Sequence, residues 1–147
     1  MSSKYTENRK ARFNYEILEE IEVGIKLLGS EAKAVRAGKA SLDGSYAYVR
    51  GGELFLVSAH IEPFQPKNTK EDYDPDRVRK LLAHKKELSR LADLEGKQGL
   101  TLVPLSMYNK GRVIKLSLAI AKGKKRDDKR QTIKRREAER EMRRALK

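Results

Sequence analysis

The chain has 147 residues, with 34 Lys or Arg against 21 Asp or Glu, and its formal net charge is +13. It has no Cys, which excludes disulfides and thiolate metal sites, and no apolar run approaches the roughly 20 residues that span a bilayer. The start of the chain lacks the apolar core of a signal peptide, so a cytoplasmic location is expected. A charge this positive predicts a polyanionic partner, and nucleic acid is favoured over a membrane.

A short basic segment opens the chain. It holds Lys4, Arg9, Lys10 and Arg12 against a single acid, Glu7. We expect residues 1–13 to form a basic N-terminal arm, for which a frayed and solvated terminus is the alternative.

Residues 15–28 carry the clearest hydrophobic period. Most apolar side chains fall on odd positions, and most charged ones, including Glu22, fall on even positions. This alternation predicts a strand with one buried face and one polar face. Gly24 interrupts the run, which favours a bulge or a sharp bend at that point.

A short helix and a hairpin are predicted next. The helix is expected within residues 29–38, with Ser30 as its cap and Gly38 at its end. Residues 46–50 and 53–59 are rich in strand-forming side chains, and a Gly-Gly pair separates them. Such a pair suits a two-residue turn between antiparallel strands, so a hairpin is expected.

Two helical segments are predicted in the middle of the chain. Asp74-Pro75-Asp76 is typical of a helix start with proline at the first helical position, and the apolar residues of 78–82 keep helical spacing after it. A second helix is expected to start near His84, with Leu88 and Leu91 on its inner face.

Two further strands complete the expected body. They cover residues 101–108 and 112–121, and Pro104 belongs at an edge or a bulge because it lacks an N–H. If the interrupted first strand counts as two, about six strands result, with helices inserted between them. The predicted fold class is mostly β with short helices. We expect an OB-like six-stranded antiparallel barrel over residues 14–121, followed by a basic C-terminal tail.

The tail, residues 122–147, contains 13 Lys or Arg and 5 Asp or Glu. Residues 132–147 can form a helix with a thin apolar stripe, but an isolated helix of about 16 residues is marginal in water. Like charges oppose its ordering further. We therefore expect the tail to be disordered when free and to become helical against ribosomal RNA, which would neutralise its charge.

No group of residues in the sequence predicts catalysis. The histidines, His60 and His84, lack metal-ligand partners at a useful spacing, and structural roles are favoured for both. No glycine-rich phosphate loop is present in the sequence. The expectation is a protein that is not an enzyme, with no metal, no cofactor and no small-molecule substrate.

Four segments resemble the SsrA-binding protein (small protein B) family of bacterial trans-translation in their order and spacing. They are residues 8–12, residues 22–36 with Glu22-Val23-Gly24-Ile25, residues 79–85, and residues 123–130 with Asp128-Lys129-Arg130. The resemblance implies an OB-like barrel that binds the tRNA-like domain of transfer-messenger RNA (tmRNA) and delivers it to stalled ribosomes. It also implies that the tail occupies the empty mRNA channel near the decoding centre, against small-subunit ribosomal RNA.

The matched positions and their neighbours give the expected site residues. Those expected to bind tmRNA are Asn8, Arg9, Lys10, Arg12, Phe13, Glu22, Lys33, Arg36, Leu82 and Lys85. Those expected to serve the ribosome are Gly123, Lys124, Lys125, Asp128, Lys129, Arg130, Lys134, Arg135 and Arg136.

Each residue type suits a different contact with RNA. Cations bind phosphates, whereas the Asn8 amide and the Glu22 carboxylate can read base edges. Leu82 either touches RNA or belongs to the core. Many family members have histidine where this chain has Phe13, which can stack on a base but cannot donate a hydrogen bond. An aromatic residue or histidine is also common where this chain has Asp127.

Two other RNA-binding functions remain open at this stage. One is a basic ribosomal or assembly protein that does not use tmRNA. The other is a non-specific binder of single strands, which needs stacking aromatics on its binding face. Tyr46, Tyr48 and Phe55 are the candidates for that face, and some of them are expected in the core.

Overall fold

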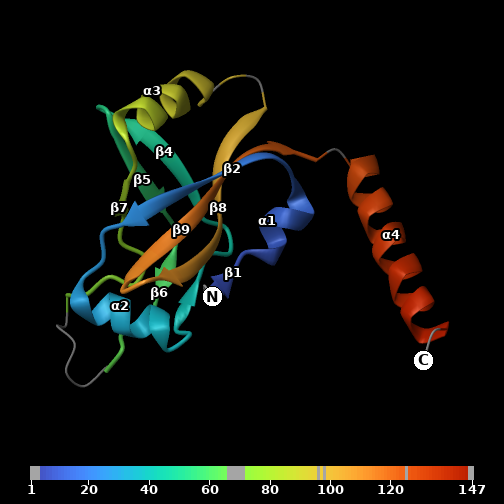
Figure 1. The fold of residues 1–147 in the computed structure, drawn as a ribbon, viewed down its shortest axis with the longest axis horizontal. Coiled ribbons are helices and arrows are strands. Elements are labelled where there is room, and N and C mark those ends of the chain that lie inside the picture. The colour runs from blue at the N-terminus through green and yellow to red at the C-terminus, as the bar shows by residue number, and fades with distance from the viewer. Residues whose placement is uncertain (1–3, 66–71, 96, 98, 125, 146–147) are drawn as a thin grey trace.

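The computed structural model describes residues 4–65, 72–95, 97, 99–124 and 126–145, without the side chains of residues 126–129, 131 and 132. Figure 1 shows a strongly curved antiparallel sheet with short helices around it, and a longer helix that projects from one side. The predicted mostly-β class is confirmed. The longest strands are β2 (Tyr15–Ile25), β8 (Leu100–Lys110) and β9 (Val113–Gly123).

Strand β2 shows the alternation that the sequence predicted. Its even-numbered glutamates are exposed, while Val23 is buried in the core. The register irregularity against β9 falls between Ile17 and Glu19, not at Gly24. Gly24 pairs with β9 on one side and β7 on the other, and a Cβ added there would lie 3.2 Å from the Cβ of Leu82. A side chain at this position would crowd Leu82, so the close approach of the strands favours glycine.

Helix α2 (Gly29–Arg36) lies within the predicted range, but Ser30 is not its cap. Leu28 is the N-cap residue, and the carboxylate of Glu31 accepts a hydrogen bond from the Leu28 N–H at 2.8 Å. Gly38 follows the helix with φ +76°, a conformation that favours glycine. The short strands β3 (Ala40–Ser41) and β6 (His60–Ile61) then pair in a separate two-stranded sheet.

The predicted hairpin is confirmed as β4 (Tyr46–Arg50) and β5 (Glu53–Val57). Gly51 and Gly52 both have positive φ, as a type I′ turn requires.

The helix predicted after Asp74-Pro75-Asp76 is wrong. Arg79–Leu82 is instead strand β7, which pairs with β5 on one side and with β2 on the other. Arg79 and Leu81 are buried and Leu82 is exposed, so the side chains follow a period of two. Strand pairing on both edges overrides the local helical spacing.

The second predicted helix is confirmed as α3 (Lys85–Leu94), with His84 at its N-cap and Leu91 buried.

The strand order is β1-β8-β4-β5-β7-β2-β9. The last strand, β9, also pairs with β8, which closes the order from β8 to β9 into a ring. Six strands therefore form a closed ring, and β1 (Lys4–Glu7) adds to the edge of β8. The ring is uneven. Strands β4 and β8 pair only at Ala47 and Leu102, whereas β8 and β9 pair along almost their whole length. Pro104 lies at the irregularity in β8, which confirms the predicted bulge.

In the residues that the structure describes, the expected N-terminal arm is packed against the body. Strand β1 pairs with β8, and helix α1 (Arg9–Asn14) follows it. Ala11 on α1 is buried against Val103, Leu105 and two alanines of β9. This small apolar cluster lies apart from the main core inside the ring, and it fastens α1 to the outer surface of the sheet.

Helix α4 (Arg126–Ala145) begins six residues before the predicted tail helix. It is helical in this structure, whereas the sequence favoured disorder for the free chain. Its described side chains are exposed, and it extends away from the ring (Figure 1). Among the described residues, no helix is both long enough and apolar enough to cross a membrane.

Candidate nucleic-acid interface

Asn8 fixes the position of the basic helix α1. Its side-chain oxygen accepts a hydrogen bond from the Ala11 N–H at 3.1 Å, which caps the helix. Its amide nitrogen donates to the carbonyl oxygens of Leu42 at 3.1 Å and Pro104 at 2.9 Å. With only 2% of Asn8 exposed, the amide is not presented to a base edge as the sequence suggested. Asn8 instead ties α1 to two distant parts of the body.

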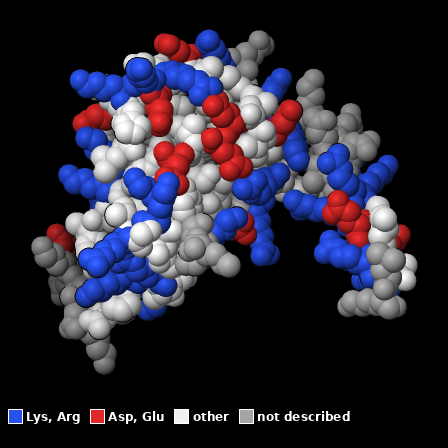
Figure 2. All heavy atoms as spheres, in the orientation of Figure 1, with Lys and Arg blue, Asp and Glu red and all other residues white. Residues whose placement is uncertain are grey.

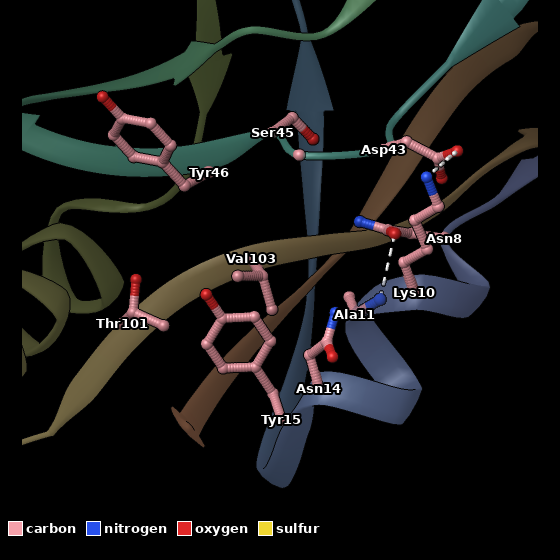
Figure 3. A pocket seen from close by; sticks show the side chains of 11 residues that line it. Asn8, Lys10, Ala11, Asn14, Tyr15, Asp43, Ser45, Tyr46, Thr101 and Val103 are labelled. Atoms are coloured by element: carbon pink, nitrogen blue, oxygen red, sulfur yellow. Dashed lines mark hydrogen bonds and ion pairs between the residues drawn. The ribbon is translucent and has the colours of Figure 1, made fainter. Parts of the chain in front are cut away.

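The cations of α1 are exposed because Ala11 alone turns inward. The Lys10 Nζ lies 3.7 Å from a carboxylate oxygen of Asp43 (Figure 3), and Arg12 lies 3.5 Å from a carboxylate oxygen of Glu20. Exposed ion pairs of this length are weak and easily exchanged for phosphate contacts. Arg9, Lys10 and Arg12 therefore form a basic edge on the outer face of the sheet.

Phe13 lies at the end of α1 that faces the tail. Its ring centroid is 5.4 Å from the guanidinium carbon of Arg136 on α4, a cation–π contact. The Lys124 N–H also donates to the carbonyl oxygen of Asn14 at 2.9 Å. The predicted tmRNA-binding residues of α1 are therefore in contact with the tail, which carries the predicted ribosome-binding residues.

Glu22 lies on the exposed face of β2, as predicted. One of its carboxylate oxygens accepts a hydrogen bond from the Lys110 Nζ at 2.7 Å, and the other accepts one from the Tyr108 hydroxyl at 2.5 Å. The bond from Lys110 first, and then that from Tyr108, hold the pKa of Glu22 below its ordinary value. Burial and the nearby Glu22 raise the pKa of Tyr108. The site therefore presents a carboxylate and a neutral phenol at neutral pH.

A group of cations lies at the end of the β8–β9 hairpin. Arg36 on α2 donates from its guanidinium to the carbonyl oxygen of Arg112 at 3.1 Å, and Lys33 is exposed on the same helix. Figure 2 shows Lys and Arg side chains gathered over α2 and the hairpin turn, with acidic side chains over β2. We call Lys33, Arg36, Lys110 and Arg112 the basic rim.

Leu82 and Lys85 are close in sequence but serve different surfaces. Leu82 is 51% exposed beside Gly24, so it is not a core residue. Lys85 lines a hollow of about 490 Å³ with the turn of the β4–β5 hairpin. Glu22 on β2 and Leu82 beside it on β7 thus lie between Arg12 of α1 and the basic rim, and Lys85 lies outside that line.

A groove of about 470 Å³ separates α1 from the start of β4. Tyr15 and Tyr46 contribute to its lining, as do the polar side chains of Asn14 and Thr101 (Figure 3). The combination of aromatic and polar groups, with Lys10 at one side, is suited to an RNA base and its phosphate.

The structure also reveals residues that the sequence did not identify. Glu31 on α2 is buried and accepts hydrogen bonds from Arg79 at 2.9 and 2.6 Å, from Arg77, and from the Tyr73 hydroxyl at 3.1 Å. Burial alone would raise the pKa of Glu31, but the bonds from Arg77, the Leu28 N–H and Arg79 lower it to about 2. Arg79 is fully buried, so it holds α2 to the body and does not bind RNA.

The predicted tail residues begin where the sheet ends. Gly123 is the last residue of β9, and Arg130, Lys134, Arg135 and Arg136 are exposed on α4. Lys125 and the side chains of Asp128 and Lys129 lie outside the described residues. Within the described part of the chain, no cluster of His, Asp and Glu side chains could hold a metal ion.

Comparisons with known proteins agree in one family. A family model described as SmpB protein matches residues 5–147. An SsrA-binding protein of Gloeothece citriformis is 50% identical over 142 residues, which cover 97% of this chain and 92% of that protein. One from Chloroflexus aggregans is 54% identical over 141 residues, which cover 96% and 89%. A chain of the solved structure "tmRNA-SmpB: a journey to the center of the bacterial ribosome" is 46% identical with a TM-score of 0.68, covering 86% of this chain and 92% of that chain.

Proposed function

Because this chain belongs to the SsrA-binding protein (SmpB) family, we propose that it binds the tRNA-like domain of tmRNA and delivers that RNA to stalled ribosomes for trans-translation. The main structural support is the outer surface along β2, where Glu22 and the adjacent Leu82 lie between Arg12 of α1 at one end and the basic rim at the other. The chain acts as a binding protein in the cytoplasm, where ribosomes are, and carries out no chemical step.

The surface suits a folded RNA of fixed shape. Cations at both ends of the β2 line can bind phosphates of two separated backbone segments, which selects for the distance between them. Glu22 lies between these cations and offers carboxylate oxygens that can accept hydrogen bonds from a base. The Tyr108 hydroxyl and Lys110 hold the carboxylate in one position. RNA recognition then depends on shape and on a few base contacts.

Helix α4 is proposed to enter the empty mRNA channel of the ribosome. It has 20 residues, which corresponds to about 30 Å along its axis. Its exposed cations, among them Arg130, Lys134 and Arg135, can neutralise ribosomal RNA. The link at Gly123 and Lys124 would set where the helix leaves the body.

Truncation after Lys124 tests whether the body binds the tRNA-like domain and the tail acts on the ribosome. That end keeps all of β9 and the hydrogen bond from Lys124 to Asn14. We expect the truncated chain to bind the tRNA-like domain almost as tightly as the full chain and to lose tagging activity on stalled ribosomes. A large loss of affinity for the tRNA-like domain would contradict recognition by the body, and full tagging activity would contradict the role of the tail.

A further inference from the structure

Three aromatic side chains share the outer surface of β4 and β5. Tyr48 pairs with Phe55 across the hairpin, and Tyr46 pairs with Val57 at its open end. The residues that alternate with them, such as Ala47 and Leu54, are buried in the core. From the sequence, some of these rings were expected in the core. In the described residues, none of the three belongs to the core cluster or packs against it.

This surface continues across β7 to β2. Phe55 pairs with Lys80, and the Lys26 N–H donates to the carbonyl oxygen of Lys80 at 2.9 Å. Lys26, just past the end of β2, therefore lies beside Lys80. We call Tyr46, Tyr48, Phe55, Lys80 and Lys26 the aromatic face.

The rings and cations of the aromatic face are accessible. The Tyr48 and Phe55 ring centroids are 5.5 Å apart with the ring planes tilted by 35°, and Tyr46 is 46% exposed. Lys26 and Arg50 are exposed, while Lys80 forms an ion pair with Glu53 at 2.8 Å. The face thus combines flat apolar rings with a net positive charge.

The centre of the aromatic face, Tyr48 and Phe55, lies outside the proposed tmRNA surface, although its margins adjoin that surface. Lys80 shares the outer face of β7 with Leu82, and Tyr46 also lines the groove beside α1. In the ring order, β4, β5 and β7 are consecutive, and β2, β9 and β8 form the other half. Helix α1 and Glu22 belong to that other half. Tyr48 and Phe55 are therefore the rings that distinguish the two surfaces.

We propose that the aromatic face binds an unpaired stretch of RNA, whose bases stack on Tyr46, Tyr48 and Phe55 while Lys26, Lys80 and Arg50 neutralise its backbone. Rings that lie along a sheet can stack only on bases whose faces are free, which excludes bases inside a duplex. The positive charge of the face favours RNA over an apolar protein partner. This inference goes beyond the proposed function, because it requires no tRNA-like domain.

A fluorescent oligouridylate of about ten nucleotides, within the site size of one OB-like fold, tests this with the full-length protein. We expect the Tyr48→Leu, Phe55→Leu double variant to bind it at least about fivefold more weakly, because stacking is lost. Tyr48→Phe keeps the ring and should keep the affinity. The control variant Leu18→Ala removes an exposed apolar side chain of β2 and should not change the affinity for the oligonucleotide.

The salt dependence of oligonucleotide affinity distinguishes the contribution of base stacking from that of phosphate contacts. The double variant should keep the slope of log affinity against log salt, whereas Lys26→Gln should reduce that slope by about 0.7. Lys86→Gln, an exposed cation on α3, is the control. Each variant is checked by circular dichroism, and if the double variant does not fold, the single variant Phe55→Leu replaces it.

Unchanged oligonucleotide binding by a folded ring variant would overturn the proposal. If the same variant instead lost self-association in sedimentation experiments, the face would belong to a second copy of the chain, and the RNA proposal would again be overturned. Affinity for the tRNA-like domain is measured on the same samples and should not change. A failure of the proposed tmRNA function would therefore be visible separately.

Discussion

At the scale of single residues, two predicted RNA contacts have different roles in the structure. Asn8 is buried and binds only other parts of the protein, whereas Glu22 is at the surface with its carboxylate held by two donors. Substitution of Asn8 should therefore act through folding, and substitution of Glu22 should act through binding.

Asn8→Ala removes the cap of α1 and the two hydrogen bonds from the Asn8 amide to the carbonyl oxygens of Leu42 and Pro104, of which Leu42 still accepts from Ser45. We expect the free energy of unfolding to fall by about 2 kcal/mol or more, because buried groups lose their partners. Urea denaturation measures this. Asn14→Ala at the other end of α1 is the control, and an equal effect of both substitutions would refute the anchoring role of Asn8.

Glu22→Gln keeps the shape of the side chain and removes its charge. We expect affinity for the tRNA-like domain to fall about tenfold, in the range of one lost base contact, while thermal stability stays the same. The matched control is Glu16→Gln, an exposed glutamate on the same face of β2. Equal binding by both variants, measured by filter binding, would remove Glu22 from the RNA site.

At the scale of secondary structure elements, α2 depends on a buried charge network. The pKa of Glu31 is lowered from 4.5 to about 2, so the folded state favours its ionised form. The network therefore contributes stability above the ordinary pKa of a glutamate and loses it as the pH falls towards 2. The α2 part of the basic rim, Lys33 and Arg36, should detach from the body under the same conditions.

We expect the free energy of unfolding to drop by about 3 kcal/mol between pH 4.5 and pH 2 through Glu31 alone. The paired variant Glu31→Leu, Arg79→Met replaces both buried charges with apolar groups and should show a shallower fall. Urea denaturation at several pH values gives both curves. Identical slopes would show that Glu31 does not control the acid response.

Helix α4 has few contacts with the body, so its order depends mainly on its own hydrogen bonds and charges. An exposed helix of 20 residues with many like charges should be only partly formed in free protein. The difference in circular dichroism between the full chain and the chain ending at Lys124 should show partial helicity that rises when RNA is added. A helix that is complete without RNA would contradict the predicted ordering of the tail on the ribosome.

The sequence predicted those elements whose local pattern and tertiary surroundings agree. The alternation in β2, the Gly-Gly hairpin and the start of α3 at His84 are all local features. Strand β7 was predicted as a helix because its pairing with β5 and β2 is invisible in a local window. The partners of Glu22 were missed for a similar reason, since Tyr108 and Lys110 are more than 80 positions away and converge only across the sheet.

At the scale of the whole molecule, positive charge is distributed over three regions: α1, the basic rim and α4. The net charge of +13 alone would give affinity for any polyanion. What distinguishes a binder of the tRNA-like domain is the fixed geometry of α1, Glu22 and the rim on one half of the ring.

The most direct test of this account is a competition between the tRNA-like domain of tmRNA and an unstructured RNA of equal length for the full-length protein, at about 50 and 200 mM salt. Electrostatic binding to both RNAs should weaken steeply with salt. The account predicts that the preference for the tRNA-like domain persists or grows at the higher salt, because shape and the Glu22 contacts do not depend on counterion release. Equal affinity for both RNAs at both salt concentrations would contradict it.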